Sequence, residues 1–497
     1  MKLAKENIDR AYNKIKRLAN KAFEKQDYNK AILELERSAK IANLFNFIYS
    51  DSDSESLIRQ LSARIISSPV DTFTSEQKKY VFYDSFGWDN RGLTQQYVRA
   101  FKSLKVDFLY IYENEDYVNS KCLAQDLREC GEHVTIYKLN RSLPEIEQIR
   151  RLYDRIIQYA PEKIFLHIAP WAVKALCVFY ALPQIEKYNI NLTDHAFWLG
   201  NECFDYNIEF RNYGYSVSKE KRGFKSERLL MLPYYPIVNH NQFEGFPVEL
   251  HPGSVKIFSG GAFYKIYGEK GAYFDIVKRI LTKNLQAVLL FAGTGEAGPL
   301  MKFIKENKFE KRFILLGNRK DINEVFKACD IYLCTYPFTG GLMAQYAAIN
   351  GKPILSYSSS DFPTNYIEDI VCYNDSRKIT YTDLGQFYEY SDKLCVDPIF
   401  RQEEGRELKQ CVIDQEMFDA KVGQILDKGD TGIKGKEGLI INYERFSKKY
   451  LEVENNFQDA FKLLLLSKYR IKAFFLFPKI MFKIMPWAVI KCLKRYF

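Results

Sequence analysis

Residues 326–357 read FKACDIYLCTYPFTGGLMAQYAAINGKPILSY, and this segment says most about the architecture of the chain. Its apolar run DIYLCTY is typical of a buried parallel strand. Thr339, Gly340 and Gly341 then form a turn of small residues before the helical stretch LMAQYAAIN, which ends at Gly351. A strand, a glycine turn and a helix in this order predict one unit of a doubly wound α/β domain.

The same alternation of short apolar runs and helical stretches extends along most of the chain. Around the first segment the strand candidates are VKIFSGG, AVLLFAGTG, RFILLGN and KPILSYS, at residues 255–261, 287–295, 312–318 and 352–358. Nearer the N-terminus they are YVFYDSF, VDFLYIYE, HVTIYKL and KIFLHIAP, at residues 80–86, 106–113, 133–139 and 163–170. A segment with Pro and Gly, residues 239–254, separates the two series. We therefore predict two Rossmann-like domains in tandem, with a ligand-binding cleft at the carboxyl ends of their strands.

The length and composition agree with a globular protein of several domains. The chain has 497 residues, which is too many for one hydrophobic core. Its 47% of hydrophobic and 15% of aromatic residues exclude a disordered or collagen-like chain. We expect a helical segment at 1–75, a first Rossmann-like domain at 76–245, a second at 246–425, and a helical C-terminal region at 426–497.

The first 68 residues are rich in Ala, Lys, Glu and Leu, and their apolar residues follow a helical spacing. This spacing predicts an antiparallel helical pair. The piece YNKAI at 28–32 resembles half of a tetratricopeptide repeat, and a plain helical cap is the alternative. We interpret the polar string SDSDSES, residues 50–56, as a linker, although its Asp51 and Asp53 form the D-x-D pattern of some metal–nucleotide sites.

The charge distribution singles out the end of the chain. The formal net charge is +10, and residues 461–497 contain nine Lys or Arg and no Asp or Glu. The rest of the chain is therefore nearly neutral. A nucleic-acid-binding protein would carry its basic residues on the folded domains, so we do not expect nucleic acid as a partner.

The last 27 residues mix Phe, Met, Ile and Trp487 with lysines, and two prolines interrupt them. No apolar run reaches the ~18–20 residues that span a bilayer. Such a segment can lie in the membrane interface, with its apolar side chains among the acyl chains and its lysines near anionic lipids. A packed helix with solvated lysines is the alternative. Because the N-terminus lacks the apolar stretch of a secretion signal, we expect a cytoplasmic protein on the inner face of a membrane.

Glycines follow several strands of the second Rossmann-like domain. They leave backbone N–H groups open to an anion, and the dipole of a following helix favours negative charge there. Lys265 adds a cation that can reach the same region. The residues expected to hold a diphosphate group are Gly260, Gly261, Lys265, Gly295, Asn318, Arg319, Thr339, Gly340, Gly341 and Gln345.

These pieces, in this order, resemble the GT-B glycosyltransferases, from about residue 80 to residue 420. Tyr264, Lys265 and Ile266 resemble the segment of O-GlcNAc transferases whose lysine contacts the donor diphosphate. Residues 83–101 are similar to the first strand, glycine loop and helix of the acceptor domain in these enzymes. The resemblance implies an acceptor domain at 76–245, a nucleotide-sugar domain at 246–425, a UDP-sugar donor, and neither a metal ion nor another cofactor.

A transferase that inverts the anomeric configuration needs a base for the acceptor hydroxyl, whereas a retaining enzyme mainly needs a stabilised leaving group. The segment NINLTDHAFWLG, residues 189–200, places Asp194 and His195 just after an apolar strand. We favour His195 as the base, with Asp194 beside it. Asp89 in the first glycine loop is the competing candidate. For each of them, capping of the following helix is the alternative role.

The sequence therefore predicts a metal-independent hexosyl- or N-acetylhexosaminyl-transferase in polysaccharide biosynthesis, with a glycan or lipid-linked acceptor at a membrane. Three alternatives stay open. The chain could be a protein O-glycosyltransferase whose N-terminal helices choose the substrate, or a nucleotide-sugar 2-epimerase. It could also be a non-catalytic membrane adaptor with this fold, because the acidic residue that related enzymes carry near the start of the diphosphate helix is absent near Tyr346.

Overall fold

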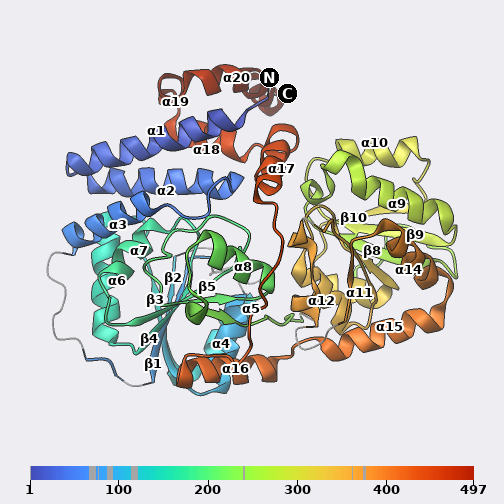
Figure 1. Ribbon diagram of the computed structural model, residues 1–497, viewed down its shortest axis with the longest axis horizontal. Coiled ribbons are helices and arrows are strands. Elements are labelled where there is room, and N and C mark those ends of the chain that lie inside the picture. Colours follow the sequence, from blue (N-terminus) through green and yellow to red (C-terminus); the bar gives the residue numbers. More distant parts are fainter. Residues whose placement is uncertain are drawn as a thin grey trace. The chain divides into compact units, whose positions relative to one another are not determined.

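The computed structural model describes residues 2–66, 74–76, 78–86, 93–113, 121–238, 241–360, 362–372 and 377–496 (Figure 1). The chain divides into two compact units. Unit 1 comprises Met1–Glu209, Val217–Leu230 and Tyr443–Phe497, and unit 2 comprises Phe210–Ser216 and Met231–Asn442. Each unit contains one β-sheet.

The sheet of unit 1 has the strand order β3-β2-β1-β4-β5-β6-β7. The strands are β1 Lys79–Asp84, β2 Asp107–Tyr112, β3 Val134–Lys138, β4 Lys163–His167, β5 Glu186–Ile190, β6 Tyr206–Glu209 and β7 Leu229–Met231. Neighbours from β3 to β6 pair in parallel. The strand order changes direction between β1 and β4. In doubly wound sheets such a switch point is where ligands bind.

The sheet of unit 2 has the order β10-β9-β8-β11-β12-β13, and its neighbouring strands are parallel. The strands are β8 Val255–Gly260, β9 Ala287–Ala292, β10 Phe313–Gly317, β11 Ile331–Leu333, β12 Ile354–Tyr357 and β13 Thr380–Tyr381. The switch point of this sheet lies between β8 and β11. The loops after these two strands therefore meet at one edge.

The strands form where the sequence has continuous apolar runs, because helices cover both faces of a parallel sheet. All residues of β4 and of β9 are buried. The helices that follow the strands are α4 Leu93–Ser103, α5 Lys121–Glu129, α6 Glu145–Tyr159, α7 Val173–Tyr180 and α8 Asn212–Lys221, and in unit 2 α9 Ala272–Lys283, α10 Gly298–Glu306, α11 Ile322–Ala328, α12 Gly341–Ile349, α13 Glu368–Val371, α14 Leu384–Val396, α15 Pro398–Cys411 and α16 Gln415–Lys428. The predicted strand runs and the α/β class are confirmed.

The two ends of the chain pack together in unit 1 (Figure 1). The helices involved are α1 Lys5–Glu24, α2 Tyr28–Phe45, α3 Ser52–Ile65, α17 Tyr443–Asn456, α18 Ala460–Tyr469, α19 Lys472–Leu476 and α20 Pro478–Tyr496. The side-chain amide of Asn455 accepts a hydrogen bond from the Leu3 N–H and donates one to the Leu3 carbonyl oxygen, both at 2.8 Å. The rings of Phe45 and Phe461 pack with their centres 5.4 Å apart.

This packing corrects the expected division into four parts. The segment at 1–75 and the helices after Asn442 belong to the same compact unit as the first sheet. The physical reason is that α2 buries apolar side chains on more than one face, so it needs neighbours on both sides.

The expected linker at 50–56 is also corrected, because α3 begins inside it. Asp51 is the N-cap residue of α3, and its side chain accepts a hydrogen bond from the Ser54 N–H. Its carboxylate also pairs with Lys16 of α1 at 2.7 Å. The D-x-D string is therefore a helix start, which is a common position for Ser and Asp.

Candidate functional site

The glycine loops of unit 2 lie at the carboxyl edge of its sheet. Gly260 ends β8 and Gly261 follows it, Gly293 and Gly295 follow β9, and Gly340 follows β11. Since β9, β8 and β11 are neighbours in the sheet, these three loops lie next to one another. The structure thus brings together residues that the sequence places up to about 80 positions apart.

Two of these loops approach so closely that only glycine fits between them. The Gly261 N–H donates to the Ala292 carbonyl oxygen at 2.9 Å, and the Phe263 N–H donates to the Thr294 carbonyl oxygen at 2.9 Å. A Cβ atom at Gly293 would overlap the carbonyl oxygen of Gly261. Close backbone approach, rather than freedom of rotation, is therefore the reason for glycine at position 293.

Lys265 lies beside the first turn of α12. It belongs to the short 3₁₀ helix Phe263–Ile266, and its carbonyl oxygen accepts a hydrogen bond from the Phe338 N–H at 3.3 Å. Its Nζ is 3.7 Å from the position that a Cβ of Gly340 would occupy. Because Gly340 is the N-cap of α12, the ammonium group and the positive end of the helix dipole act on the same spot. This arrangement suits a phosphate group.

The loop before α12 is fixed by a residue that the sequence did not single out. Asn365 is buried, and its Oδ1 accepts a hydrogen bond from the Thr339 N–H at 2.9 Å. Its Nδ2 donates to the Tyr357 carbonyl oxygen at the end of β12 at 3.4 Å. Asn365 therefore uses the Thr339 N–H, which we expected to face an anion, and holds the shape of the loop instead.

Arg319 is committed to the protein and does not extend as a free cation. Its guanidinium donates to both carboxylate oxygens of Asp321, at 2.7 and 2.6 Å, and to the Gly245 carbonyl oxygen at 2.7 Å. These bonds attach the chain after β10 to the segment before β8. The structure thus gives Arg319 a bracing role, and its expected contact with a diphosphate stays a prediction. Its neighbour Asn318 is exposed.

Gln345 has a similar bracing role. Its side chain is fully buried, and its Nε2 donates to the carbonyl oxygens of Tyr234 and Ile370. These contacts attach α12 to the segment after β7 and to α13. The side chain thus lies on the packed face of α12, and the expected contact of Gln345 with a diphosphate stays a prediction.

The expected catalytic pair of unit 1 follows β5. The Nδ1 atom of His195 is 3.2 Å from the Oδ1 atom of Asp194, which is buried. The imidazole is 31% exposed and packs against the rings of Phe446 and Tyr450 in α17. An imidazole oriented by a carboxylate in this way keeps its other nitrogen for a proton. The competing base, Asp89, lies outside the described residues.

A buried polar cluster supports the loop that carries this pair. Arg222 donates to the carbonyl oxygens of Asp194, at 2.8 Å, and of Ala196. Behind it, the fully buried carboxyl of Glu209 accepts hydrogen bonds from Ser218 and from Asn191. Burial raises the pKa of Glu209 from 4.5 to about 7, against the opposing charge of Arg222.

This shift predicts how Glu209 affects stability across pH. The unfolded chain ionises Glu209 above pH 4.5, whereas the folded chain does so only near pH 7. As the pH rises from 4.5 to about 7, the free energy of unfolding of the wild type should therefore fall by about 3 kcal/mol relative to that of Glu209→Gln. Urea unfolding at pH 4.5 and pH 8, followed by tryptophan fluorescence, measures this, because all four tryptophans lie in unit 1. As a control, Glu227→Gln at an exposed position should show the same pH dependence of stability as the wild type. If Glu209→Gln also showed the wild-type pH dependence, the raised pKa of Glu209 would be contradicted.

A second His–Asp pair lies at the switch point of the same sheet. The Nδ1 atom of His167, at the end of β4, is 3.1 Å from the Oδ1 atom of Asp84, at the end of β1. Both side chains are buried, and Asp84 also accepts a hydrogen bond from the Tyr110 hydroxyl at 2.8 Å. Sequence reasoning passed over Asp84, although a carboxylate that ends an apolar strand is a detectable signal.

Within the described residues no group of three or more His, Cys, Asp or Glu side chains has the arrangement of a metal site.

Comparison with known proteins gives structural matches. No protein-family model and no curated protein sequence matches the chain. A point mutant of the O-GlcNAc transferase of Thermobaculum terrenum has a TM-score of 0.53 at 15% identity, with 89% of this chain and 84% of that chain covered.

Two further structures cover nearly all of their own chains. The Anabaena protein HepE, in complex with UDP and glucose, has a TM-score of 0.51 at 12% identity, over 71% of this chain and 100% of that one. A glycosyltransferase from Rickettsia africae has a TM-score of 0.50 at 12% identity, over 71% and 98%. With its two parallel sheets and the glycine loops between strand and helix, the chain has the GT-B fold.

Proposed function

We propose that this protein is a glycosyltransferase that moves a sugar from a nucleoside diphosphate to an acceptor hydroxyl. The observation that carries this is the position of the Lys265 Nζ beside Gly340, at the N-terminus of α12 and among glycine-lined loops. The Anabaena structure contains UDP, which supports a UDP-sugar as the donor. The fold shared with glycosyltransferases supports the same class of reaction.

In the proposed reaction, the bond between the sugar C1 and the diphosphate oxygen breaks, and a bond from C1 to the acceptor oxygen forms. The diphosphate leaves with an added negative charge, which the Lys265 ammonium and the helix dipole stabilise. These groups support transfer without a metal ion. If the reaction inverts the anomeric centre, His195 takes the proton of the acceptor hydroxyl, while Asp194 orients its ring and stabilises the imidazolium.

The test is a screen of UDP-hexoses and UDP-N-acetylhexosamines with the purified full-length chain, in the presence of a metal chelator. Release of UDP or sugar transfer supports the proposal. Conversion of the donor into its 2-epimer would assign the epimerase reaction instead. A chain that neither binds nor turns over any of these donors in calorimetry would have the role of a non-catalytic adaptor.

We also propose that the acceptor is held at a membrane, because the last helices expose an apolar and basic face. Among the described residues no helix is long and apolar enough to cross a bilayer. The exposed apolar side chains of this face are Leu463, Ile471, Phe474, Phe475, Phe482 and Met485. Exposed cations lie between them, at Lys468, Arg470, Lys472 and Lys479. Apolar side chains can enter the acyl region while the cations contact anionic headgroups.

The opposite side of the same helices is packed. Phe461 and Tyr469 contact α2, and the Lys483 Nζ donates to Asn7 of α1 at 3.0 Å. The tail therefore combines the two predicted roles. One side packs on the folded unit, and the other side is exposed and can lie in the membrane interface. We propose the inner face of the membrane as the location, with a lipid-linked saccharide as the acceptor.

Replacing both Phe475 and Phe482 by Glu should abolish binding to anionic vesicles. Phe475 is 81% exposed and Phe482 67%, so the substitutions leave the core intact. Burial of each ring in lipid is worth about 1.5–3 kcal/mol, so partition should fall by at least about 100-fold. Flotation with phosphatidylglycerol vesicles measures it. Leu285→Glu, at a position that is 77% exposed in unit 2, is the matched control. Undiminished flotation of the double variant would remove the membrane proposal.

A further inference from the structure

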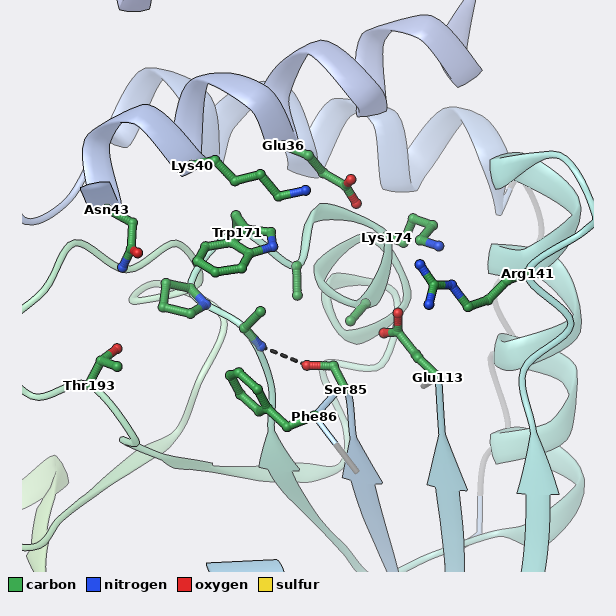
Figure 2. Close-up of a pocket in the computed structure, with 14 residues that line it drawn as sticks. Glu36, Lys40, Asn43, Ser85, Phe86, Glu113, Arg141, Trp171, Lys174 and Thr193 are labelled. Atoms are coloured by element: carbon green, nitrogen blue, oxygen red, sulfur yellow. Dashed lines mark hydrogen bonds between the residues drawn. The ribbon is translucent and has the colours of Figure 1, made fainter. Parts of the chain in front are cut away.

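A pocket with a volume of about 430 Å³ lies in unit 1, between α2 and the carboxyl edge of the sheet (Figure 2). Its lining comes from α2, from α7 and from the segments that follow β1 to β5. It therefore covers the switch point between β1 and β4, where doubly wound sheets bind ligands. Its volume falls within the ~300–1,000 Å³ of small-molecule sites.

The floor of the pocket is fixed by hydrogen bonds between the loops. The Ser85 hydroxyl accepts a hydrogen bond from the Ala169 N–H at 2.8 Å (Figure 2). The Ser85 N–H in turn donates to the His167 carbonyl oxygen at 3.0 Å. The loops after β1 and β4 are thus joined, which gives a ligand a preformed surface.

Aromatic carbon is accessible inside the pocket. Trp171 and Phe86 are both partly exposed there, and Figure 2 shows the Trp171 ring beneath α2. The Nζ of Lys40 lies 5.6 Å from the centre of the Trp171 ring. A pocket that combines an indole face with polar groups suits a ligand that is apolar on one face and polar at its edges.

Charged side chains of both signs surround this aromatic surface. The cations are Lys40, Arg141 and Lys174, and the carboxylates are Glu36 and Glu113. Among the described residues none of these cations forms an ion pair with either carboxylate. The Lys174 Nζ donates to Gln148 at 2.8 Å, and Glu113 accepts a hydrogen bond from Tyr83. These charged groups offer both donors and acceptors of hydrogen bonds, which suits a ligand with many hydroxyl groups.

The helix α2 supplies Glu36, whose carboxyl can serve as donor or acceptor. Burial raises the pKa of Glu36 from 4.5 to about 7, although Lys40 and Lys174 oppose this shift. Near neutral pH the group is thus present in both forms. A hydroxyl can then donate to it or accept from it.

We propose that this pocket binds a neutral sugar ring of the acceptor, and that α2 selects that sugar through Glu36 and Lys40. The C–H face of the ring packs on Trp171, and its hydroxyls bond to the surrounding charged groups. The identification of the bound sugar as the acceptor rests on the proposed glycosyltransferase function, whereas the binding of a sugar to this pocket does not. The N-terminal helices then belong to a saccharide site and do not serve as an arm for protein substrates.

Saturation-transfer NMR on the full chain, without donor, tests the proposal. The probes are the methyl glycosides of glucose, galactose, mannose, N-acetylglucosamine and N-acetylgalactosamine. At least one should bind, and Trp171→Ala and Glu36→Gln should each weaken its affinity by at least about 10-fold. Glu132→Gln, an exposed substitution in the same unit, is the matched control and should leave binding unchanged. Thermal unfolding checks that each variant is folded. If one of the two pocket variants is not, Lys40→Met is used in its place.

The readouts separate this inference from the proposed function. Loss of sugar binding in the pocket variants, with donor hydrolysis to UDP unchanged, supports the inference. If no glycoside binds the wild type, or if the variants bind as well as the control, the inference is wrong, whatever the donor assay gives. Binding of a Ser- or Thr-containing peptide that the same variants abolish would also overturn it. Sugar binding without any donor turnover would refute only the glycosyltransferase assignment.

Discussion

Lys265→Met should lower the rate of sugar transfer by about 10²–10³-fold, the loss typical for one electrostatic group that stabilises a developing charge. The side chain keeps its length and apolar stem but loses the ammonium beside Gly340. The leaving diphosphate then has only backbone N–H groups and the dipole of α12 to stabilise its charge. The loss should fall mainly on kcat, because the charge increases when the bond to C1 breaks.

The matched control is Lys278→Met, which removes an exposed lysine from α9 of the same unit. It should retain wild-type kinetics and wild-type affinity for UDP. Rates of UDP release and calorimetric binding of UDP measure both variants. Full transfer activity in Lys265→Met, in a chain with an unchanged circular dichroism spectrum, would refute the donor site described here.

Gly293→Ala should destabilise unit 2 by about 3 kcal/mol or more and abolish donor binding. The added Cβ would overlap the Gly261 carbonyl oxygen, which is a backbone atom and cannot move away as the end of a flexible side chain could. The loops after β8 and β9 would have to separate. Their separation would break the hydrogen bond from Gly261 to Ala292 and displace the segment that carries Lys265.

Gly298→Ala provides the comparison, five positions further along the chain. The nearest atom to its Cβ would be the Glu296 Oε1, the end of a flexible side chain, at 3.0 Å. As the first residue of α10, it should tolerate alanine without loss. Urea unfolding followed by circular dichroism, together with UDP calorimetry, compares the two. Equal stability of both variants would show that the loops adjust more readily than the packing implies.

Much of the fold could be predicted because parallel strands covered on both faces appear as continuous apolar runs. Two of the strands that sequence reasoning missed lack such runs. In β6, Asn207 and Glu209 are buried polar residues that bond to each other, and β13 has only two residues. The assignment of the end helices to unit 1 could not be predicted, since it depends on contacts such as Leu3 with Asn455.

In the candidate site, too, features marked by neighbouring residues could be predicted, whereas features that depend on residues far along the chain could not. Lys265 and the glycines are marked by short motifs, so their place at the sheet edge followed from the order of the strands. Arg319 pairs with Asp321, which is only two residues away, so the sequence could have revealed this ion pair. The partners of Gln345 are backbone carbonyls far along the chain, which no motif indicates. The pocket beneath α2 combines this helix with loops after several strands, so only the structure assembles it.

The hydrogen bonds between Leu3 and Asn455 also bear on how the protein folds as it is synthesised. The two residues are 452 positions apart, and all of unit 2 is translated between them. At about 5–20 residues per second, α1 waits roughly 20–90 s for the helices that complete its packing. During this interval the side of α1 and α2 that later packs on the C-terminal helices remains open to chaperones and to other nascent chains, while unit 2 can fold on the ribosome. Ribosome stalling or truncation shortly before residue 443 should therefore yield a chain that aggregates through its N-terminal end.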